Sequence, residues 1–393
     1  RCTVPRSSAT GESFVKDPAE LSANLTSECP DFGQSGFDGR DRWYGCAMAT
    51  ATRQGGPAPA DGIAALAERF DPDVIHLPRG RARIRLEVLG GKTCDAVIIG
   101  RRLRLSRPNP DKQPDAVLSA DAAAWTRIAA DIRGGMEAWR ARRLVIRGSL
   151  HVGVGFLAAT NGAGEPGRLE FGVLRTRGFG AVSVLSAGKG PETIVCLHGL
   201  GGTKASFLPT VSALADRYRV VALDLPGFGE SDKPIGAPYD APWFARAVFE
   251  AMDELDLDTA HIAGNSMGGR IALELGLAHD ERVEKLVLLA PSLAWLKERP
   301  WRWLLQMPLP RLGYLQPTPR WAVEPIVRRL VPGADEGWTA AGVDEFLRAY
   351  CTPAGRFAFY ECARNIYMDE PYGSDGFWTR MKKLTPEALF VWG

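Results

Sequence analysis

The sequence predicts two folded domains, a doubly wound α/β domain preceded by a smaller α+β domain. From residue 168 onward, continuous apolar strands alternate with amphipathic helices, the pattern of a mostly parallel sheet covered by helices on both faces. Between residues 58 and 160, short strands of alternating polarity mix with helices. The Gly-rich run 161–167 separates the two patterns and is expected to be a linker.

The first 57 residues predict no folded structure. Ser, Gly, Pro, Asp and Arg are abundant there, and no period of 2 or 3.6 persists. We expect a disordered or non-native leader. The chain begins with Arg1, and Met48 is the first methionine, so the sequence leaves open whether residues 1–47 belong to the native protein.

Charge and composition narrow the classes of partner. Lys and Arg total 48 against 46 Asp and Glu, so no global field attracts nucleic acid. No run of 18 apolar residues and no apolar signal core occur, which predicts neither a membrane anchor nor a secretory signal. The seven scattered cysteines lack C-x-x-C spacing, which argues against zinc and a disulfide framework. We therefore expect a cytoplasmic protein without a cofactor, whose partner is a small molecule.

The smaller domain is expected to contain five strands and several helices. Strands are predicted at 81–88, 94–99, 102–105, 116–119 and 144–147, and helices at 63–70, 125–132 and 136–143, before an apolar run at 150–159. Asp121 is the expected N-cap of the second helix. Alternation places Arg81, Arg83, Arg85 and Glu87 on one strand face. That stripe is either an anion-binding surface or, as we favour, the solvated face of a half-buried strand.

Two segments of this domain carry a family resemblance. They are Asp115-Ala116-Val117-Leu118-Ser119-Ala120-Asp121, followed by Trp125, and Leu144-Val145-Ile146-Arg147-Gly148-Ser149-Leu150. In this order they resemble the sterol carrier protein type 2 family over about residues 60–160. The resemblance implies an apolar tunnel for a fatty acyl chain, sterol or similar lipid. The alternative is a small α+β module whose apolar residues only fill its own core.

The larger domain is expected to alternate strands and helices. Strands are predicted at 169–176, 181–186, 193–197, 220–223, 261–264 and 283–289, and helices at 205–218, 242–255 and 267–279. Directly between a buried strand and a helix stands Gly264-Asn265-Ser266-Met267-Gly268. Small residues at its two ends allow a sharp turn that exposes the Ser266 hydroxyl as a nucleophile. The alternative role for Ser266 is a helix N-cap.

Two Gly-containing loops precede this turn. The first, His198-Gly199-Leu200-Gly201-Gly202, ends an earlier strand, so the amides of Leu200 and Met267 are placed to bind a developing oxyanion. His198 precedes the Gly turn, and we expect it to make structural hydrogen bonds and not to act as the base. The second loop, Asp224-Leu225-Pro226-Gly227-Phe228-Gly229-Glu230-Ser231, taken alone is a turn.

The three motifs, in this order, resemble the α/β-hydrolase family over residues 168–393. The resemblance implies Ser266 as nucleophile, an acid after a late strand and a histidine near the C-terminus. No histidine follows the helix after Ser266, and the late-strand pattern 388–393 ends the chain. We therefore expect a C-terminally truncated domain whose acid and histidine lie beyond Gly393, and which shows no appreciable ester hydrolysis by itself.

A helical cap is expected at about 293–385, where the family carries one. Six of the eleven tryptophans lie there: Trp295, Trp301, Trp303, Trp321, Trp338 and Trp378. An aromatic cap suits an apolar acyl or ring substrate, and the alternative is that the tryptophans pack the cap onto the sheet.

The sequence thus favours a serine hydrolase that acts on carboxylic esters of lipid-like or other apolar substrates through an acyl-enzyme. An acyltransferase, a cofactor-free haloperoxidase-like enzyme and a carbon–carbon hydrolase are alternatives on the same fold. A non-catalytic lipid or sterol carrier is the alternative of another class. Oligomeric state and acyl length are left open.

Overall fold

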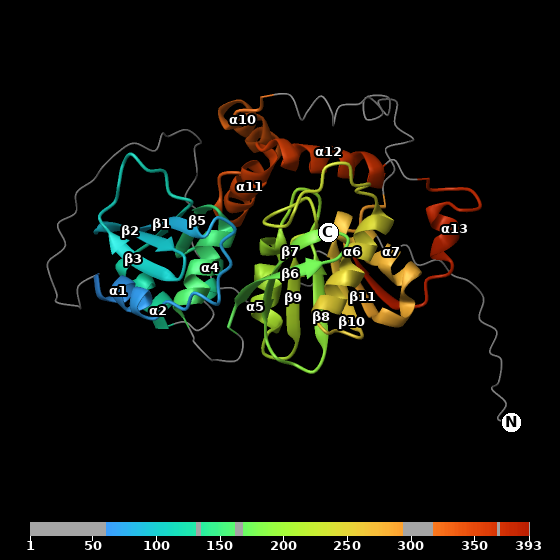
Figure 1. Cartoon of the computed structure of the whole chain (residues 1–393), viewed down its shortest axis with the longest axis horizontal. Coiled ribbons are helices and arrows are strands. Elements are labelled where there is room, and N and C mark those ends of the chain that lie inside the picture. The colour runs from blue at the N-terminus through green and yellow to red at the C-terminus, as the bar shows by residue number, and fades with distance from the viewer. Residues whose placement is uncertain (1–59, 131–134, 162–167, 294–316, 368–369, 393) are drawn as a thin grey trace, which may run out of the picture. The chain divides into compact units, whose positions relative to one another are not determined.

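The computed structural model describes residues 60–130, 135–161, 168–293, 317–367 and 370–392, which form two sheets with helices around them (Figure 1). The smaller sheet has the strand order β3-β2-β1-β4-β5, and the larger has the order β12-β11-β10-β8-β9-β7-β6. The predicted leader 1–57 and most of the predicted linker lie outside the described residues. All the described residues belong to one compact unit.

The smaller sheet is mixed, as the α+β pattern predicts. Its strands are β1 (Arg81–Val88), β2 (Thr93–Ile99), β3 (Arg102–Ser106), β4 (Ala116–Ala120) and β5 (Leu144–Gly148). Its helices are α1 (Ala60–Glu68), α2 (Ala122–Ala130), α3 (Met136–Arg140) and α4 (Leu150–Thr160). β1 runs parallel to β4, and the other three pairings are antiparallel. One sheet face is buried, with Ile84, Leu86 and Leu118 fully covered.

Side-chain caps begin two of these helices. Asp121 Oδ1 accepts a hydrogen bond from the amide of Ala124 at 2.7 Å, as expected for the N-cap of α2. Ser149 Oγ accepts one from Val152 at 3.2 Å and so begins α4, which the sequence showed only as an apolar run. α4 is apolar all round because its far side packs into the same core as the larger sheet.

The larger sheet is mostly parallel. Its strands are β6 (Glu170–Thr176), β7 (Gly180–Ala187), β8 (Thr193–Leu197), β9 (Arg219–Leu223), β10 (Ala260–Asn265), β11 (Val283–Leu289) and β12 (Glu387–Val391). Strands β8 to β12 run parallel, while β7 is antiparallel to both β6 and β9. β8 lies between β9 and β10, so the chain reverses its direction of travel across the sheet at β8. Such a switch point opens a crevice at the carboxyl ends of the strands.

Helices cover both faces of this sheet. α6 (Ala241–Glu254) and α7 (Met267–Ala278) share one core with one face, and α5 (Leu208–Leu214) shares the other core with α4. The helix predicted at 205–218 is shorter than expected. A 3₁₀ turn at Lys204–Phe207 precedes α5, and the helix ends at Leu214.

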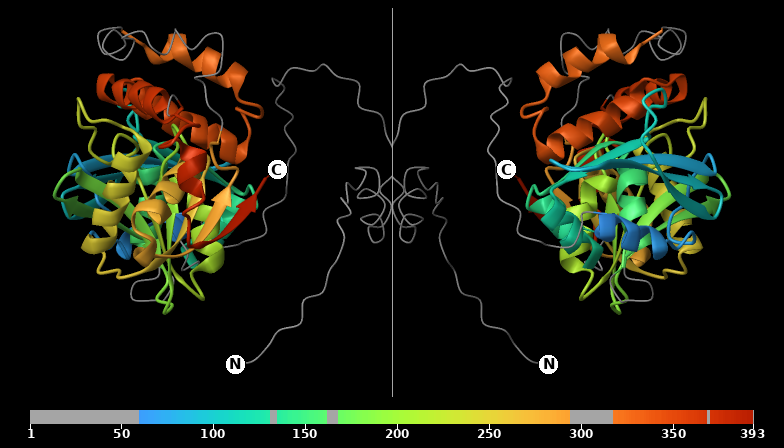
Figure 2. Two further views of the ribbon diagram at one scale, coloured as in Figure 1. Left: turned by 90° about the vertical axis from the view of Figure 1, so that its right-hand side faces the viewer. Right: turned by 90° about the vertical axis from the view of Figure 1, so that its left-hand side faces the viewer.

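The segment expected to be a cap is helical where it is described. It contains α10 (Arg320–Leu330), α11 (Gly337–Tyr350), α12 (Pro353–Tyr367) and α13 (Phe377–Met381). α10, α11 and α12 lie together at one end of the larger sheet in every view (Figures 1 and 2). None of the described helices is long and apolar enough to cross a membrane.

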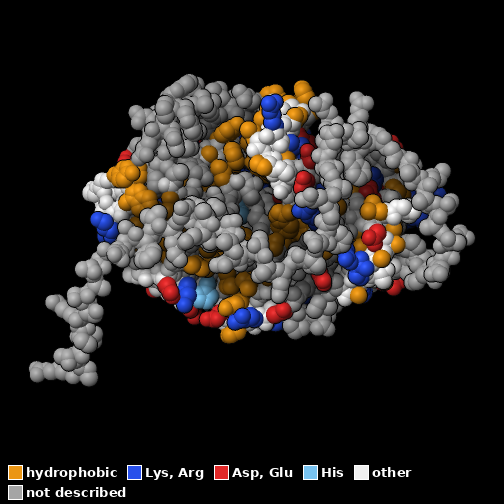
Figure 3. Space-filling model, turned by 180° about the vertical axis from the view of Figure 1, so that it is seen from behind, with side chains coloured by type: hydrophobic (Ala, Val, Ile, Leu, Met, Phe, Trp, Pro, Cys, Tyr) orange, Lys and Arg blue, Asp and Glu red, His pale blue; other side chains and the backbone are white. Residues whose placement is uncertain are grey.

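The tryptophans of this segment do not form the expected apolar roof where they are described. Trp295, Trp301 and Trp303 lie outside the described residues. Trp321 is 79% exposed, and Trp338 stacks on Trp139 of the smaller domain with ring centroids 4.1 Å apart. Seen from behind, the described surface mixes hydrophobic patches with side chains of both charges (Figure 3).

Two glycines allow α7 to approach the sheet closely. A Cβ on Gly268 would lie 2.1 Å from the carbonyl oxygen of Leu197, and one on Gly264 would lie 2.3 Å from that of Gly268. Both neighbours are backbone atoms, which cannot rotate away. The end of β8, the end of β10 and the start of α7 are therefore in direct backbone contact.

We predict that Gly268→Ala lowers the free energy of unfolding by about 3 kcal/mol, because the added methyl overlaps a fixed carbonyl. The urea midpoint of the purified variant measures the loss. Gly342→Ala is the control, since nothing lies within 4 Å of a Cβ there, in the middle of α11. It should raise stability by about 0.5–1 kcal/mol. Equal effects of the two substitutions would contradict this account of the contact.

Candidate active site

Ser266 has a strained backbone at the junction of β10 and α7. Its φ is 52° and its ψ is −112°, a conformation that residues other than glycine rarely adopt. Its amide donates to the carbonyl of Leu289 in β11 at 2.9 Å, and its carbonyl accepts from Ser292 at 2.9 Å. Both bonds tie the turn to the end of β11 and the residues that follow it. The hydroxyl makes no capping bond to α7, so the N-cap alternative does not describe it.

The first Gly loop lies against this turn. A Cβ on Gly199 would lie 3.3 Å from the Ser266 Cβ and 3.0 Å from Asn265 Oδ1. The amide of Gly202 donates to Gly199 at 2.9 Å, which closes the loop. Leu200 therefore lies in a tight loop on one side of Ser266. Met267, on the other side, is the first residue of α7, where helix geometry leaves backbone amides without an intrahelical partner.

His198 connects the two Gly-containing loops. The Leu225 amide donates to its Nε2 at 3.0 Å, so Nδ1 carries the proton and donates to Gly199 O at 2.8 Å. The side chain is fully buried, and this burial lowers the pKa of His198. Both ring nitrogens are thus occupied by backbone groups, and the imidazole is neutral. This geometry fits the structural role expected for His198.

The carboxylate of Asp224 organises the second loop. It is fully buried and accepts hydrogen bonds from the amide and the Nζ of Lys204, at 2.7 and 2.5 Å, and from the Glu230 amide at 2.9 Å. Burial raises the pKa of Asp224, but the Lys204 ammonium outweighs that effect and brings the pKa to about 2. Sequence reasoning missed Lys204. The available signal was a lysine two residues after the Gly loop, followed by an acid at the end of the next strand.

The remaining histidines lie elsewhere in the fold. His76 and His151 belong to the smaller domain, His261 is a residue of β10 beside Glu192, and His279 follows the last turn of α7. Among the described residues, none of the five histidines hydrogen-bonds to Ser266. The base and the acid expected beyond Gly393 therefore stay predictions.

Aromatic side chains of the cap cover the Gly loop, but they are not the tryptophans that the sequence suggested. Phe346 Cδ2 lies 2.8 Å, and Phe359 Cε2 3.5 Å, from the position that a Cβ on Gly201 would take. Tyr350 stacks on Phe346, and its hydroxyl lies 2.6 Å from that of Tyr360. The i, i+4 spacing of Phe346 and Tyr350 could have identified this aromatic cluster.

The cap helix α11 is also bound to the smaller domain. Asp344 pairs with Arg147 of β5 at 2.6 Å and accepts a hydrogen bond from Gly148 at 3.2 Å. Arg320 and Arg328, at 2.9 and 3.1 Å, complete its surroundings. Next to it, Glu345 accepts a hydrogen bond from the Leu150 amide at the start of α4, at 3.0 Å. α11 is therefore anchored on two elements of the smaller domain.

A second ionic contact joins α11 to the loop around Asp224. Arg348 pairs with Glu345 of its own helix and with Glu230, both at 2.5 Å. Glu230 donates its amide to the Asp224 carboxylate. Although burial lowers the pKa of the Arg348 guanidinium, the two carboxylates outweigh it and keep the pKa above its ordinary value. The cap, the second loop and the buried carboxylate thus form one continuous set of contacts.

Part of the chain is similar to a known family. Residues 192–372 match the model of the family described as alpha/beta hydrolase fold. Among solved structures, a bacterial membrane phospholipase A is 27% identical, with a TM-score of 0.45 over 57% of this chain and 70% of that one. The α/β-hydrolase fold expected from the sequence is confirmed. None of these matches supports a sterol carrier domain.

Several characterised proteins share shorter segments with this chain. A pimeloyl-[acyl-carrier protein] methyl ester esterase of Aeromonas hydrophila is 40% identical over 121 residues, 31% of this chain and 46% of that protein. A 2-hydroxy-6-oxononadienedioate/2-hydroxy-6-oxononatrienedioate hydrolase of Cupriavidus pinatubonensis is 43% identical over 106 residues, 26% and 37% of the two chains. The dihydrolipoyllysine-residue acetyltransferase component of an acetoin cleaving system of Cupriavidus necator is 40% identical over 104 residues, which are 26% of this chain and 28% of that protein. The chain thus spans less than half the length of these relatives.

Removing the cation beside Asp224 should destabilise the fold in a pH-dependent way. We predict that Lys204→Met lowers the free energy of unfolding at pH 7 by about 3–5 kcal/mol, because it leaves a buried carboxylate unpaired. Burial alone then raises the pKa of Asp224 above its unfolded value of about 3.9. Protonation favours the folded variant, so the loss should shrink between pH 7 and pH 5.

The unchanged protein should behave in the opposite way. Its Asp224 pKa is about 2, below the unfolded value, so this stabilisation is present above about pH 4 and is lost only as the pH falls toward 2. Urea midpoints at pH 7 and 5 measure the change in the variant, and midpoints at pH 5 and 3 measure the change in the unchanged protein. The exposed Lys189→Met is the control and should change neither. A Lys204→Met deficit that is the same at pH 7 and pH 5 would refute the assignment.

The contacts of Asp344 should matter more than an exposed ion pair. We predict that Asp344→Ala lowers the free energy of unfolding by about 2 kcal/mol, since it removes charged hydrogen bonds to Arg147 and the Gly148 amide. It should also accelerate hydrogen exchange in α11. Asp335→Ala removes a partner of Arg328 that is 84% exposed, and it should cost below about 0.5 kcal/mol. A chemical denaturation series compares the two, and equal losses would count against anchoring through Asp344.

Proposed function

We propose that residues 168–393 act as a serine hydrolase on carboxylic esters of lipid-like or other apolar substrates, with Ser266 as the nucleophile. The strained backbone of Ser266 is the observation that carries the proposal. The strained serine lies near the switch point of the sheet, beside a Gly loop. Such backbone strain persists only where the surrounding structure enforces it. A turn of this kind between strand and helix is where α/β hydrolases carry their nucleophile.

The proposed reaction proceeds through an acyl-enzyme. Ser266 Oγ attacks the ester carbonyl carbon while a base takes its proton, and the carbonyl electron pair moves onto oxygen. The backbone amides of Leu200 and Met267 donate hydrogen bonds to that oxyanion. Collapse of the intermediate breaks the ester bond, and the alcohol leaves with the proton from the base. Water then releases the acid by the same steps, with the base and acid residues proposed beyond Gly393.

The aromatic cluster of the cap supports an apolar acyl group as substrate. Phe346 and Phe359 lie over Gly201 in the loop that would hold the oxyanion, so an acyl chain bound there meets aromatic rings. Similarity to a methyl ester esterase favours ester cleavage. Similarity to a 2-hydroxy-6-oxononadienedioate/2-hydroxy-6-oxononatrienedioate hydrolase and to an acetyltransferase component keeps a carbon–carbon hydrolase and an acyltransferase as alternatives. A haloperoxidase-like reaction is a further alternative because one fold hosts many reactions.

The smaller domain carries a separate observation in favour of lipid binding. A cavity of about 650 Å³ lies between α1 and the first three strands, and Ile63, Val88 and Leu105 provide apolar walls. Its size fits a small-molecule ligand site. We propose a lipid or sterol carrier module here, in line with the resemblance to sterol carrier protein type 2. The cysteines described are unpaired, in keeping with the reducing cytoplasm that we propose as the location.

A fluorophosphonate probe applied to the full-length protein separates the enzyme from the carrier. We expect covalent labelling of Ser266, located by peptide mass spectrometry, and turnover of a p-nitrophenyl ester. Ser266→Ala should abolish labelling and lower turnover by roughly 10⁴-fold or more. Ser186→Ala, in β7, should change neither. Lipid bound after purification together with an unlabelled Ser266 would reject the hydrolase and favour the carrier.

A further inference from the structure

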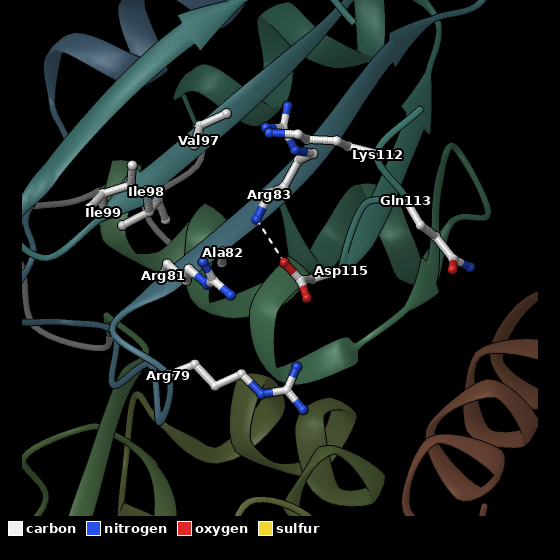
Figure 4. Close-up of a pocket in the computed structure, with 10 residues that line it drawn as sticks. All are labelled: Arg79, Arg81, Ala82, Arg83, Val97, Ile98, Ile99, Lys112, Gln113 and Asp115. Carbon is white, nitrogen blue, oxygen red and sulfur yellow. Dashed lines mark hydrogen bonds between the residues drawn. The ribbon is translucent and has the colours of Figure 1, made fainter. Parts of the chain in front are cut away.

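A basic pocket lies on the smaller domain, away from Ser266. It has a volume of about 500 Å³ at one end of β1 and β2 (Figure 4). In the close-up the side chains of Arg79, Arg81, Arg83 and Lys112 surround it, with Asp115 between them. In register, Arg81 lies opposite Ile99 and Arg83 opposite Val97, so these cations share a sheet face with apolar neighbours.

The positive charge is local. Residues 79–112 contain ten Lys and Arg and only three Asp and Glu, whereas the whole chain contains 48 and 46. A nearly neutral protein thus concentrates cations in one short segment. A concave site lined by one sign of charge attracts ligands of the opposite sign.

Only part of the predicted arginine stripe is neutralised within the protein. Arg83 and Arg85 both pair with the fully buried Asp95 of β2, each at 2.9 Å, and these two are therefore structural. Asp95 also accepts from the Asn109 amide at 3.2 Å, and the Asn109 carbonyl accepts from Arg85 at 2.9 Å. These bonds fix the loop that carries Lys112 over the sheet.

The other cations of the pocket keep their charge available. Among the described residues, Arg79, Arg81 and Lys112 have no ion pair. Asp115, the acid of the pocket, accepts a hydrogen bond from the Arg83 amide at 2.8 Å, which ties it to the backbone of β1. Three cations therefore face one carboxylate. The neighbouring wall is apolar, and Ile99 is 67% exposed.

We propose that this pocket binds a small organic anion, a carboxylate or phosphate monoester that carries a hydrocarbon part. Guanidinium groups bind carboxylate and phosphate oxygens through paired N–H donors, so Arg79 and Arg81 hold the anionic end. Lys112 adds a third positive charge from the loop. The hydrocarbon part lies on Val97 and Ile99. The site is independent of Ser266 and does not require the proposed hydrolase.

A second cavity continues from this site. It has a volume of about 320 Å³, shares Arg79, Arg81, Gln113 and Asp115 with the first, and reaches Glu230 and Arg348. Those last two residues form the ion pair that holds α11. An anion bound at Arg81 therefore lies beside the contacts that anchor the cap. The second cavity also leaves room for a ligand that is too long for the first pocket alone.

Calorimetric titration of the full chain tests the proposal with three matched probes: decanoate, decyl phosphate and uncharged decanol. We expect at least one anion to bind at least about tenfold more tightly than decanol, and inorganic phosphate to compete with it. The anion that binds more tightly identifies the headgroup as carboxylate or phosphate. Decanol binding as tightly as both anions would overturn the proposal.

Variants locate the site. Arg81→Ala should weaken anion binding about tenfold, and Arg81→Lys should recover part of the loss. Arg127→Ala, at an exposed position of α2, should leave binding unchanged. Ile99→Ser should weaken the decyl anion but not inorganic phosphate. An unchanged thermal midpoint shows that each variant is folded, which is expected because Arg81 and Ile99 are exposed. Equal effects of Arg81→Ala and Arg127→Ala would refute the site.

Discussion

The strained backbone of Ser266 is the constraint on which the arrangement of the larger domain depends. A positive φ at a serine persists only where neighbouring elements prevent relaxation. Here β11 binds the Ser266 amide, and α7 begins so close to β8 that only glycine fits at 268. The order of the strands brings β8 and β10 side by side, so the Gly loop that follows β8 lies beside the serine that follows β10.

Buried polar groups hold the loops around this turn. His198 binds a backbone group with each ring nitrogen, and Asp224 gathers Lys204 and the Glu230 amide. Loops cannot be buried unless their polar groups are paired, because an unpaired group loses its hydration without compensation. The charges of Lys204 and Asp224 stabilise one another, because either charge buried without the other would lower the stability of the fold. The loops are thus fixed by the same bonds that make their burial possible.

Local patterns predicted much of this fold and of the candidate site. The pattern of apolar and polar residues predicted the strands of both sheets, and the glycines around Ser266 predicted the turn, because each of these signals lies within a few neighbouring residues. Contacts between distant segments were missed. Arg147 and Asp344 are 197 positions apart, and Asp95 lies on a strand whose pairing with the arginine stripe no local period specifies. The role of the cap tryptophans was predicted wrongly for the same reason. Composition suggested that they cover the site, but tertiary packing places Phe346 against Gly201 and Trp338 against Trp139.

Helix α11 links the smaller domain to the candidate site through consecutive residues. Asp344 and Glu345 bind β5 and the start of α4, while Phe346, the next residue, lies against Gly201. An α-helix is stiff over one turn, so a displacement of its anchor moves Phe346 by a similar distance. The smaller domain therefore helps to set the position of an aromatic ring over the Gly loop, whether or not it carries a ligand of its own. That geometry gives a physical reason for joining the two modules in one chain, because a separate module would have to pay the entropy of association to hold the same helix.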